Sequence, residues 1–563
     1  RERMPRVPHN AGSAFAGRLV GPDGYGAAFT ASSRCTPDYH PTSHKDAMSC
    51  PDRELWAGAE RKEMASMEKH GVFEIVHGSR CGDDSIVHDR CVMDTKFVYK
   101  IKRNRDGSVD KHKARLCGRG FSQRSGVDYH ETYAPVMSSS SLRLILSLAA
   151  TRRLRTREFD VSSAFLTADM HEAVYIRAPA CMGLPAGTLL RLRESLHGCK
   201  QSGRNFSLEF SAHLQSLGLR PPSSDPCVFV HHKGSDFAVL GIHVDDGILC
   251  CSSPTLESRI IAGLRSKCEL GCLRELQQFL GLAGDHASDG SMSVHAAKYV
   301  RELAERFGMS AARPTHTPAV VGVTLRPVAE DDSDLLDPAV PHRELVGSLI
   351  HLSTSIRPDI SAAPTAPARF VSRPSCAHWR AAKRILAHLV THPRLGLKFR
   401  CSPQAPRLTV HSDSDWGGII DARSRRRSMT GCLVRHHGNV IAWKARTQRT
   451  PALSACEAEL MAAVDGSKEA MFARNLLTEL QCPVPRFALL TDSSGAYNIV
   501  NEPNHRGRVR HMDLRWNHLR TLVEDGIASV GHTPGSSNPA DVFTKAIPGP
   551  HFRKLIDMFM VTV

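Results

Sequence analysis

The sequence lacks any uninterrupted apolar run near the roughly 20 residues that span a bilayer. Its N-terminus also lacks the charged-then-apolar pattern of a secretory signal. Its 17 cysteines include no CxxC pair and follow no framework spacing, which argues against disulfides and structural zinc sites. We therefore expect an intracellular protein with free, mostly buried thiols and no membrane partner.

Acidic residues are outnumbered, with 57 Asp and Glu against 73 Lys and Arg, so the net charge is +16. This excess favours a polyanionic partner such as nucleic acid, although a generally basic protein would show it too. The 563 residues are 41% apolar and 23% charged, which is typical of a globular chain of roughly three or four domains. Because the chain begins at Arg1, we expect a piece of a longer polyprotein.

A pair of adjacent acids interrupts an otherwise apolar stretch, FAVLGIHVDDGILCC, at residues 237–251. The two apolar runs predict a tight β-hairpin with Asp245 and Asp246 at its tip. Carboxylates held this close repel each other unless a cation lies between them, and Mg²⁺ prefers carboxylate oxygens. Asp and Gly are also ordinary turn residues, so a solvated turn is an equal alternative on this stretch alone.

The N-terminal third contains three predicted features. Residues 1–51 are rich in Gly, Pro, Ser and His and predict an unstructured lead-in. Residues 54–73 predict a helix that stops at Gly71. Residues 94–123 contain two basic strand-like runs around Asp106-Gly107, which predicts a hairpin. Its cations form either a basic finger over phosphates or a solvated charged face.

Several motifs occur in a recognisable order: DYHETYAPV, REFDVSSAFL, SLHGCKQSGRNF and HVDDG, then VGSLIHLSTSIRPDIS, SDSDWGG, ACEAEL and NPADVFTK. This succession resembles the reverse transcriptase and ribonuclease H region of the copia-type LTR retrotransposon Pol polyprotein, from about residue 52 to the end. The resemblance implies an α+β fold: a right-hand polymerase with fingers, palm and thumb, followed by an α/β ribonuclease H-like domain. The corresponding domains are 1–51 lead-in, 52–300 fingers and palm, 301–404 thumb and connection, 405–547 ribonuclease H-like, and 548–563 tail.

The resemblance assigns roles to residues of the polymerase region. Two-metal nucleotidyl transfer needs carboxylates from different strands, and Asp160 at a strand end would join Asp245 and Asp246 as catalytic metal ligands. Basic side chains near the incoming triphosphate would neutralise charge on the transferred phosphate. The implied nucleotide-binding residues are Lys113, Arg115, Phe165 and Gln201. Phe165 would exclude a ribose 2′-hydroxyl, but a core phenylalanine is an equal interpretation. Cations expected on the nucleic-acid backbone are Lys100, Lys102 and Arg103.

In the C-terminal region, two strand ends and two helices each bring an acid: Asp413, Glu459, Asp492 and Asp541. Together they could hold two Mg²⁺ for phosphodiester hydrolysis, as the ribonuclease H resemblance implies. Ser454 and Glu457 fit a helix capping box, which leaves Glu459 as the catalytic choice. Asp541 has an alternative as a first-turn acid favoured by the helix dipole. Asp415 and His532 are weaker candidates.

A basic stretch, RGRVRHMDLRWNHLR at residues 506–520, lies between these acids. Arginines with an aromatic residue suit an RNA/DNA hybrid that is recognised by backbone and shape, although a solvated helix face competes. The residues expected to bind nucleic acid are Arg508, Arg510, Arg515 and Trp516.

The segment after RPDI carries Pro364 and Pro367 where the family has a helix. A proline inside a helix costs on the order of 3 kcal/mol, so either the helix starts after Pro367 or this copy is damaged. Other departures from the family include His197 and His243, yet all seven expected acids remain. The alternatives to an active enzyme are a catalytically inactive or co-opted nucleic-acid-binding relic, or a protein with only the ribonuclease H half active.

The expected function is RNA-directed DNA polymerisation with ribonuclease H cleavage of RNA in hybrids. The expected cofactor is Mg²⁺, two ions per active site, with Mn²⁺ as an alternative. Expected partners are an RNA template, a DNA primer, the RNA/DNA hybrid, dNTPs, and the upstream protease and integrase of the same polyprotein. The expected locations are the cytoplasm, in a virus-like particle, and the nucleus.

Overall fold

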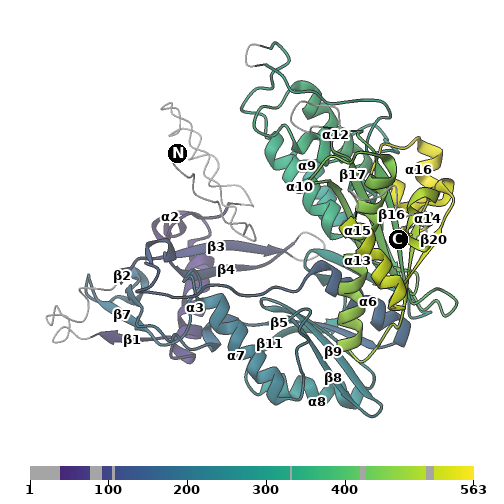
Figure 1. Cartoon of the computed structure of the whole chain (residues 1–563). Coiled ribbons are helices and arrows are strands. Elements are labelled where there is room, and N and C mark those ends of the chain that lie inside the picture. The colour runs from purple at the N-terminus through teal and green to yellow at the C-terminus, as the bar shows by residue number, and fades with distance from the viewer. Residues whose placement is uncertain (1–38, 77–91, 104–107, 330–331, 419–425, 503–512) are drawn as a thin grey trace. The chain divides into compact units, whose positions relative to one another are not determined.

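The computed structural model describes residues 39–76, 92–103, 108–329, 332–418, 426–502 and 513–563 (Figure 1). Helices and strands alternate along the chain, which confirms the α+β class. The chain forms two compact units: unit 1 comprises Arg1–Thr132 and Ala168–Ser202, and unit 2 comprises Tyr133–Thr167 and Gly203–Val563. None of the helices in the described ranges is long and apolar enough to cross a membrane.

The described residues of unit 1 form two helices, two short 3₁₀ turns, a four-stranded sheet and a hairpin. The sheet has the order β1-β7-β6-β2, and the hairpin pairs β3 with β4. The elements are α2 (His44–Ser49), α3 (Arg53–Lys69), β1 (Phe73–Val76), β2 (Val92–Met93), β3 (Thr95–Arg103), β4 (Val109–Gly118), η1 (Gly120–Ser122), β6 (Tyr175–Arg177), η3 (Ala180–Met182) and β7 (Leu189–Leu192). The basic hairpin is thereby confirmed, while its Asp106-Gly107 turn lies outside the described residues.

The lead-in, predicted to be mostly unstructured or a linker, contains the short helix α2 in its last part, and Ser43 caps this helix by accepting from the Asp46 N–H. Residues 1–38 lie outside the described part of the chain. The next helix, α3, matches its prediction, and Gly71 takes φ +61°, a conformation suited to a helix C-terminus. Trp56 of α3 is buried against Tyr99 of β3, with ring centroids 5.3 Å apart.

A five-stranded antiparallel sheet at the start of unit 2 carries the first predicted acids. Its order is β11-β5-β10-β9-β8, so the neighbouring strands β5 and β10 carry Asp160 next to the end of β5 and Asp246 at the start of β10. The elements of this region are α6 (Ser139–Arg152), β5 (Arg155–Val161), η2 (Ala164–Thr167), α7 (Ser202–Ser216), β8 (Val228–Lys233), β9 (Asp236–His243), β10 (Asp246–Cys251), α8 (Pro254–Arg265) and β11 (Leu270–Glu275).

A second sheet of unit 2 has the order β12-β13-β14-β15-β21 and is accompanied by helices. Its last strand comes from the C-terminal residues expected to form a tail, and Gly396 of β15 pairs with Val561 of β21. The elements are β12 (Gln278–Phe279), β13 (Leu282–His286), β14 (Met292–His295), α9 (Ala297–Arg306), α10 (His342–Ser355), η4 (Pro358–Ile360), α11 (Thr365–Ala368), α12 (Cys376–Thr391), β15 (Leu395–Phe399), α16 (Gly549–Ile556) and β21 (Val561–Thr562).

The helix expected to start after Pro367 does not do so. The short helix α11 already contains Pro367, and the next helix, α12, begins only at Cys376. Pro364 lies at the N-cap of α11, where a proline's missing N–H removes no helical hydrogen bond. The two prolines therefore divide the segment into short turns without breaking a long helix.

A buried ion cluster fixes the RPDI segment against α12. Arg357 donates to both carboxylate oxygens of Asp359 at 2.8 and 2.7 Å, and His388 Nε2 lies 2.9 Å from Asp359 Oδ2. Arg357 and His388 are completely buried. Burial alone would raise the pKa of Asp359, but the Arg357 charge and these hydrogen bonds outweigh it and lower the pKa.

We predict that Asp359→Asn destabilises the protein by about 3–5 kcal/mol, because it leaves a buried arginine charge uncompensated. Since the native pKa of Asp359 is lowered, its contribution is present above the unfolded-state pKa and is lost as the pH falls below it. Urea unfolding measures the change. The control is Asp557→Asn, which breaks an exposed pair with Arg553 and should cost about 0.5 kcal/mol or less. Equal losses in both variants would contradict the prediction.

The C-terminal sheet has the order β18-β17-β16-β19-β20 and matches the ribonuclease H-like arrangement expected from the sequence. Three antiparallel strands are followed by β19 and β20, which join in parallel. The elements are β16 (Leu408–Asp415), β17 (Met429–His436), β18 (Asn439–Thr447), α13 (Ala455–Glu479), β19 (Phe487–Thr491), α14 (Ser494–Asn501), α15 (Asp513–Glu524), β20 (Ala528–His532), η6 (Gly535–Ser537) and η7 (Pro539–Phe543).

Helix α6 connects the first sheet of unit 2 to the C-terminal sheet, and residues 141–150 of this helix are all buried. Its Arg143 donates to the carbonyl of Ile441 at 2.8 Å and to that of Ser355 at 2.7 Å. The guanidinium carbon lies 4.0 Å from the centre of the Trp443 ring. Burial lowers the pKa of Arg143 to about 9, so these carbonyls and the ring compensate a costly buried charge.

Candidate active site

The predicted hairpin is confirmed, with β9 and β10 joined by the two residues Val244 and Asp245. His243 pairs with Asp246, and the Asp245 carbonyl accepts a 2.7 Å hydrogen bond from the Val161 N–H. Val244 takes φ +61°, which is unusual for a β-branched residue and costs of order 1–3 kcal/mol. Such strain persists only where the surroundings hold it, and it lies here beside a predicted metal ligand.

The strands bring the three predicted polymerase acids to one edge of the sheet. Asp160 of β5 is the cross-strand partner of Asp246 of β10. A Cβ on Gly271 of β11 would lie only 2.7 Å from Asp160 Oδ1, so a larger residue there would displace this carboxylate. Opposed carboxylates of like charge destabilise a sheet, which makes this arrangement suited to hard cations. The catalytic role of the three acids stays a prediction.

The C-terminal acids form a tighter group. Ligand atoms of Asp413, Asp492 and Asp541 all lie within 4.8 Å of one another, the only such acidic, His or Cys group in the ranges that the structure describes. Asp413 and Asp541 are buried. Strand β16 continues past the predicted end at Asp413 to Asp415. Asp541 lies on the 3₁₀ turn η7, not on the start of a longer helix as expected.

Glu459 lies beside this group on α13. Its Oε1 accepts a 3.1 Å hydrogen bond from the Ser414 N–H, while Oε2 is buried without a hydrogen-bond partner. Burial, with Asp413 and Asp492 nearby, raises the pKa of Glu459 to about 9. Burial and Asp413 likewise raise the pKa of Asp541 to about 7, and Asp541 Oδ1 also lacks a partner. A pair of Mg²⁺ ions would bind the oxygens that lack a hydrogen-bond partner and would reduce the repulsion between the carboxylates.

Two residues beside the acids were missed by sequence reasoning. Lys545 Nζ lies 3.0 Å from Asp541 and 3.9 Å from Asp413, and the Thr544 hydroxyl donates to Asp413. Burial would lower the pKa of Lys545, but the neighbouring Asp413 and Asp541 raise it. Because Lys545 follows Asp541 by four residues, the helical spacing could have indicated this ion pair.

The predicted capping by Ser454 and Glu457 is present, with one backbone partner shifted by a residue. The Ser454 hydroxyl accepts from the Glu457 N–H at 3.1 Å, so Ser454 is the N-cap of α13. The Glu457 carboxylate accepts from the Leu453 N–H at 2.7 Å, one residue before the expected capping-box partner. Glu457 also pairs with Arg515 at 3.2 Å. Glu457 thus has structural contacts, and Glu459 faces the acids.

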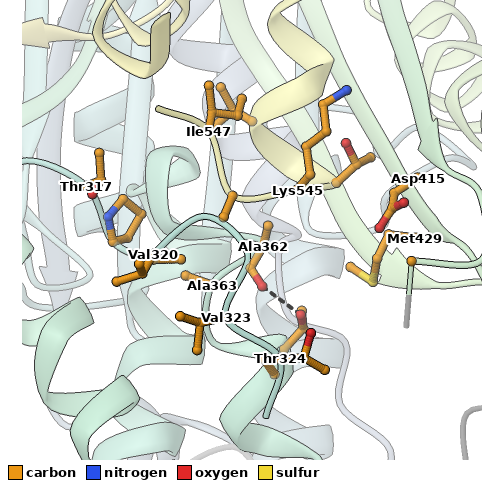
Figure 2. Close-up of a pocket in the computed structure, with 18 of the residues that line it drawn as sticks. Thr317, Val320, Val323, Thr324, Ala362, Ala363, Asp415, Met429, Lys545 and Ile547 are labelled. Atoms are coloured by element: carbon orange, nitrogen blue, oxygen red, sulfur yellow. Dashed lines mark hydrogen bonds between the residues drawn. The ribbon is translucent and has the colours of Figure 1, made fainter. Parts of the chain in front are cut away.

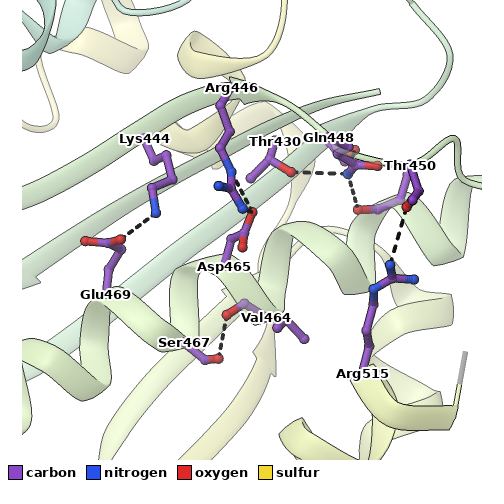
Figure 3. Close-up of polar contacts among 12 residues, drawn as sticks. Thr430, Lys444, Arg446, Gln448, Thr450, Val464, Asp465, Ser467, Glu469 and Arg515 are labelled. Atoms are coloured by element: carbon purple, nitrogen blue, oxygen red, sulfur yellow. Dashed lines mark hydrogen bonds and ion pairs between the residues drawn. The ribbon is translucent and has the colours of Figure 1, made fainter. Parts of the chain in front are cut away.

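A buried glutamine, Gln448, links the elements that carry the same site. Gln448 Nε2 lies within hydrogen-bonding distance of the Ser414 and Thr430 hydroxyls, both at 3.2 Å, and of the Ala458 carbonyl at 2.9 Å. Figure 3 shows this side chain near the start of α13, with the α13 ion pairs Lys444–Glu469 and Arg446–Asp465 further along. Gln448 therefore joins two strands to the helix that carries Glu459.

The raised pKa values of Glu459 and Asp541 predict a pH-dependent stability without metal. The folded state holds these protons more tightly than the unfolded state, so the free energy of unfolding should fall as the pH rises from about 5 to 9. Mg²⁺ competes with the protons, so its stabilising effect should grow over the same range. Thermal unfolding in EDTA and in Mg²⁺ measures both trends. A Mg²⁺ effect that shrinks as the pH rises would contradict them.

A pocket of about 310 Å³ adjoins the C-terminal acids. Figure 2 shows Asp415 and Lys545 on one side of it and Val320 and Val323 on the other. Burial and Asp413 raise the pKa of Asp415, which places this weaker candidate at the rim of the acidic group. His532 is exposed, and its Nε2 lies 3.1 Å from the Asp492 carbonyl. Both candidates therefore lie near the site without joining the three aspartates.

The predicted nucleotide-binding residues differ in their surroundings. Lys113 and Arg115 are half-buried on β4, and burial with the Arg115 charge lowers the pKa of Lys113. Phe165 is half-buried in η2, 6.2 Å from the Phe206 ring. Gln201 is only 1% exposed; it accepts from Gln123 at 3.0 Å and donates to the Asp128 carbonyl at 3.0 Å. Because its amide is buried and already bonded, Gln201 has a structural role in this fold, and its nucleotide contact stays a prediction.

The residues predicted to bind nucleic acid also differ in how exposed they are. Lys100 and Lys102 are exposed on β3, the side chain of Arg103 lies outside the description, and Arg508 and Arg510 fall in the undescribed range 503–512. Arg515 is half-buried in its pair with Glu457. Trp516 is 7% exposed and donates to the Ile499 carbonyl at 2.7 Å. The Trp516 ring therefore belongs to the core, and its contact with nucleic acid stays a prediction.

Comparison with known proteins identifies the class of the first half. Residues 85–321 match the family described as reverse transcriptase (RNA-dependent DNA polymerase). The match includes β5, β9 and β10, the three strands around the first acidic edge. These residues therefore form a reverse transcriptase domain.

Curated relatives extend the similarity over most of the chain. The chain is 30% identical over 524 residues to a retrovirus-related Pol polyprotein from transposon TNT 1-94 of Nicotiana tabacum, covering 92% of this chain and 38% of the relative. It is 30% identical over 480 residues to that of transposon RE1 from Arabidopsis thaliana, covering 84% of this chain and 32% of the relative. The chain is a relative of the copia-type LTR retrotransposon Pol polyproteins, as predicted, and spans less than half their length.

Similarity to solved structures is weaker. A foamy viral protease-reverse transcriptase in complex with double-stranded DNA matches 89% of this chain and 71% of its own, with 12% identity and a TM-score of 0.47. An RNase H1 from Halobacterium salinarum matches 27% of this chain and 98% of its own, with 17% identity and a TM-score of 0.17.

Proposed function

We propose that this chain is an RNA-directed DNA polymerase that copies retrotransposon RNA into DNA and cleaves the RNA strand of the resulting hybrid. The observation that carries the proposal is the presence of two separate acidic groups, one at the β5/β10 edge and one at the β16/β19 edge. The family match over residues 85–321 supports the first activity. The strand order of the C-terminal sheet supports the second.

At the first site, Asp160, Asp245 and Asp246 would hold two Mg²⁺ ions. The ions would activate a primer 3′-hydroxyl and stabilise the leaving pyrophosphate. The strained turn at Val244 orients the Asp245 backbone, whose carbonyl is fixed to β5. In unit 1, we keep the prediction that Lys113 and Arg115 bind the triphosphate of the incoming dNTP; they lie two residues apart and so on one face of β4.

At the second site, Asp413, Glu459, Asp492 and Asp541 would hold two ions, which supply a polarised water for phosphodiester hydrolysis. The donors are all carboxylate oxygens, as hard divalent cations prefer. Lys545 compensates the acidic charge of the site in the absence of metal and would release Asp541 and Asp413 to a cation. Mn²⁺ would be accepted by the same oxygens.

The testing experiment combines two assays on the unaltered chain. A DNA primer annealed to RNA is supplied with dNTPs and Mg²⁺, and a labelled-RNA hybrid is incubated separately. Extension and cleavage together are the expected result. Cleavage without extension would leave only the ribonuclease H half active, and binding without either reaction would establish a non-catalytic relic. Protease and integrase partners, and particle or nuclear location, belong to the longer polyprotein and are tested only with it.

A further inference from the structure

An exposed tryptophan adjoins the C-terminal acids and has no role in the proposed chemistry. Trp416 directly follows Asp415 at the end of β16, and its side chain is 55% exposed. A single exposed aromatic ring is ordinary, but a tryptophan beside a second exposed apolar residue offers a contact surface. The indole N–H donates to the Ala452 carbonyl at 3.2 Å, so the ring is held in place although it is exposed.

The same hydrogen bond joins Trp416 to a second exposed apolar residue. Ala452 belongs to the loop between β18 and α13, and the next residue, Leu453, is 75% exposed. This loop leads directly into the helix that carries Glu459, whose carboxylate accepts from the Ser414 N–H. Trp416 and Leu453 are therefore anchored to the two elements that meet at the acids.

Two exposed arginines lie on the segments next to Trp416 and Leu453. Arg449 is exposed in the same loop. Arg426 is exposed, and its Nε lies 3.9 Å from the position of a Cβ on Gly417, the residue after Trp416. An aromatic and aliphatic surface with flanking guanidinium groups matches the chemistry of a nucleic-acid backbone, in which apolar sugar faces alternate with phosphates. A protein partner would more often meet an apolar centre with few charges.

We infer that Trp416, Leu453, Arg426 and Arg449 form a docking surface for the RNA/DNA hybrid and position its scissile strand at the C-terminal acids. Trp416 and Leu453 would pack on sugar rings of the wide, shallow minor groove, where the base pairs themselves stay stacked. The two arginines would contact phosphates and contribute to affinity without sequence preference. The inference rests on the proposed ribonuclease H activity and adds a positioning surface to it.

The test measures cleavage of a labelled-RNA hybrid by the full chain. Trp416→Ala should raise KM about tenfold, the loss typical of one aromatic contact, and leave kcat unchanged. Trp416→Phe should recover most of the loss because it keeps a ring. The control Leu208→Ala removes an equally exposed side chain, 54% exposed, from α7, and should leave KM unchanged. Primer extension and thermal unfolding should be the same in all variants.

Salt dependence separates the two kinds of contact. Arg449→Gln should make the slope of log(1/KM) against log salt concentration less steep, by the amount expected for about one phosphate contact. Trp416→Ala should leave that slope unchanged. An unchanged KM in Trp416→Ala, with normal cleavage by the unaltered chain, would overturn this inference alone. A kcat loss without a KM change would also overturn it, since that would give Trp416 a different role. Absence of cleavage by the unaltered chain would overturn the proposed function and the inference together.

Discussion

Primer extension on an RNA template should fall by more than about 100-fold when Asp245 and Asp246 are both replaced by Asn. Even the outer-shell partners of metal ligands cost about 10–100-fold, and these residues are proposed as direct ligands. Asn keeps the shape of the turn, whose backbone is held by the bond between the Val161 N–H and the Asp245 carbonyl. The measurement is the rate of dNTP incorporation in Mg²⁺ on an annealed RNA template.

The matched control removes one charge from the other end of the same hairpin. Asp236 begins β9, and its carboxylate lies 3.8 Å from Arg259 in an exposed pair. Asp236→Asn should leave extension unchanged, because exposed pairs contribute little. Hybrid cleavage in the Asp245→Asn/Asp246→Asn variant should continue at the normal rate. Loss of both activities in that variant would point to a folding defect and contradict the assignment.

Apolar patterning predicted the elements that carry the acids because local sequence determines them. Two apolar runs around Asp245 and Asp246 indicated the hairpin, and Ser454 with Glu457 indicated the start of α13. Glu459, which was preferred to Glu457 on that basis, lies near Asp413. Each of these signals lies within a few residues of the element that it predicts. They depend on turn, strand and helix-capping preferences, which survive in isolation.

Contacts between distant segments could not be predicted in this way. Gln201 and Trp516 were assigned to ligands by their motif and composition, yet both are buried by residues far away in the sequence. Burial of a polar or aromatic group depends on tertiary packing, which periodicity does not report. Trp416 is the converse case: it lies in the SDSDWGG motif, and only its exposure in the structure and its bond to Ala452 distinguish it from a core tryptophan.

Glu459→Gln should lower hybrid cleavage by more than about 100-fold and, without metal, make the protein more stable. The cleavage loss follows because the variant removes an anionic ligand, whose effect should exceed that of outer-shell partners. The stability gain has a separate cause. Burial and the nearby Asp413 and Asp492 raise the pKa of Glu459 to about 9, so the folded state disfavours its charge at neutral pH. Gln removes that charge and fits the same space.

The control for this variant lies on the same helix. Glu469 pairs with Lys444 (Figure 3), and Glu469→Gln should leave cleavage unchanged and should not raise the stability. Cleavage rates in Mg²⁺ and urea unfolding in EDTA at pH 8 measure the two effects. Loss of cleavage together with loss of stability would mean that Glu459 serves the fold. Loss of cleavage with a gain of stability would mean that Glu459 lowers the stability of the fold but is needed for metal binding. Active sites often hold a charged group where water is excluded, at the expense of stability.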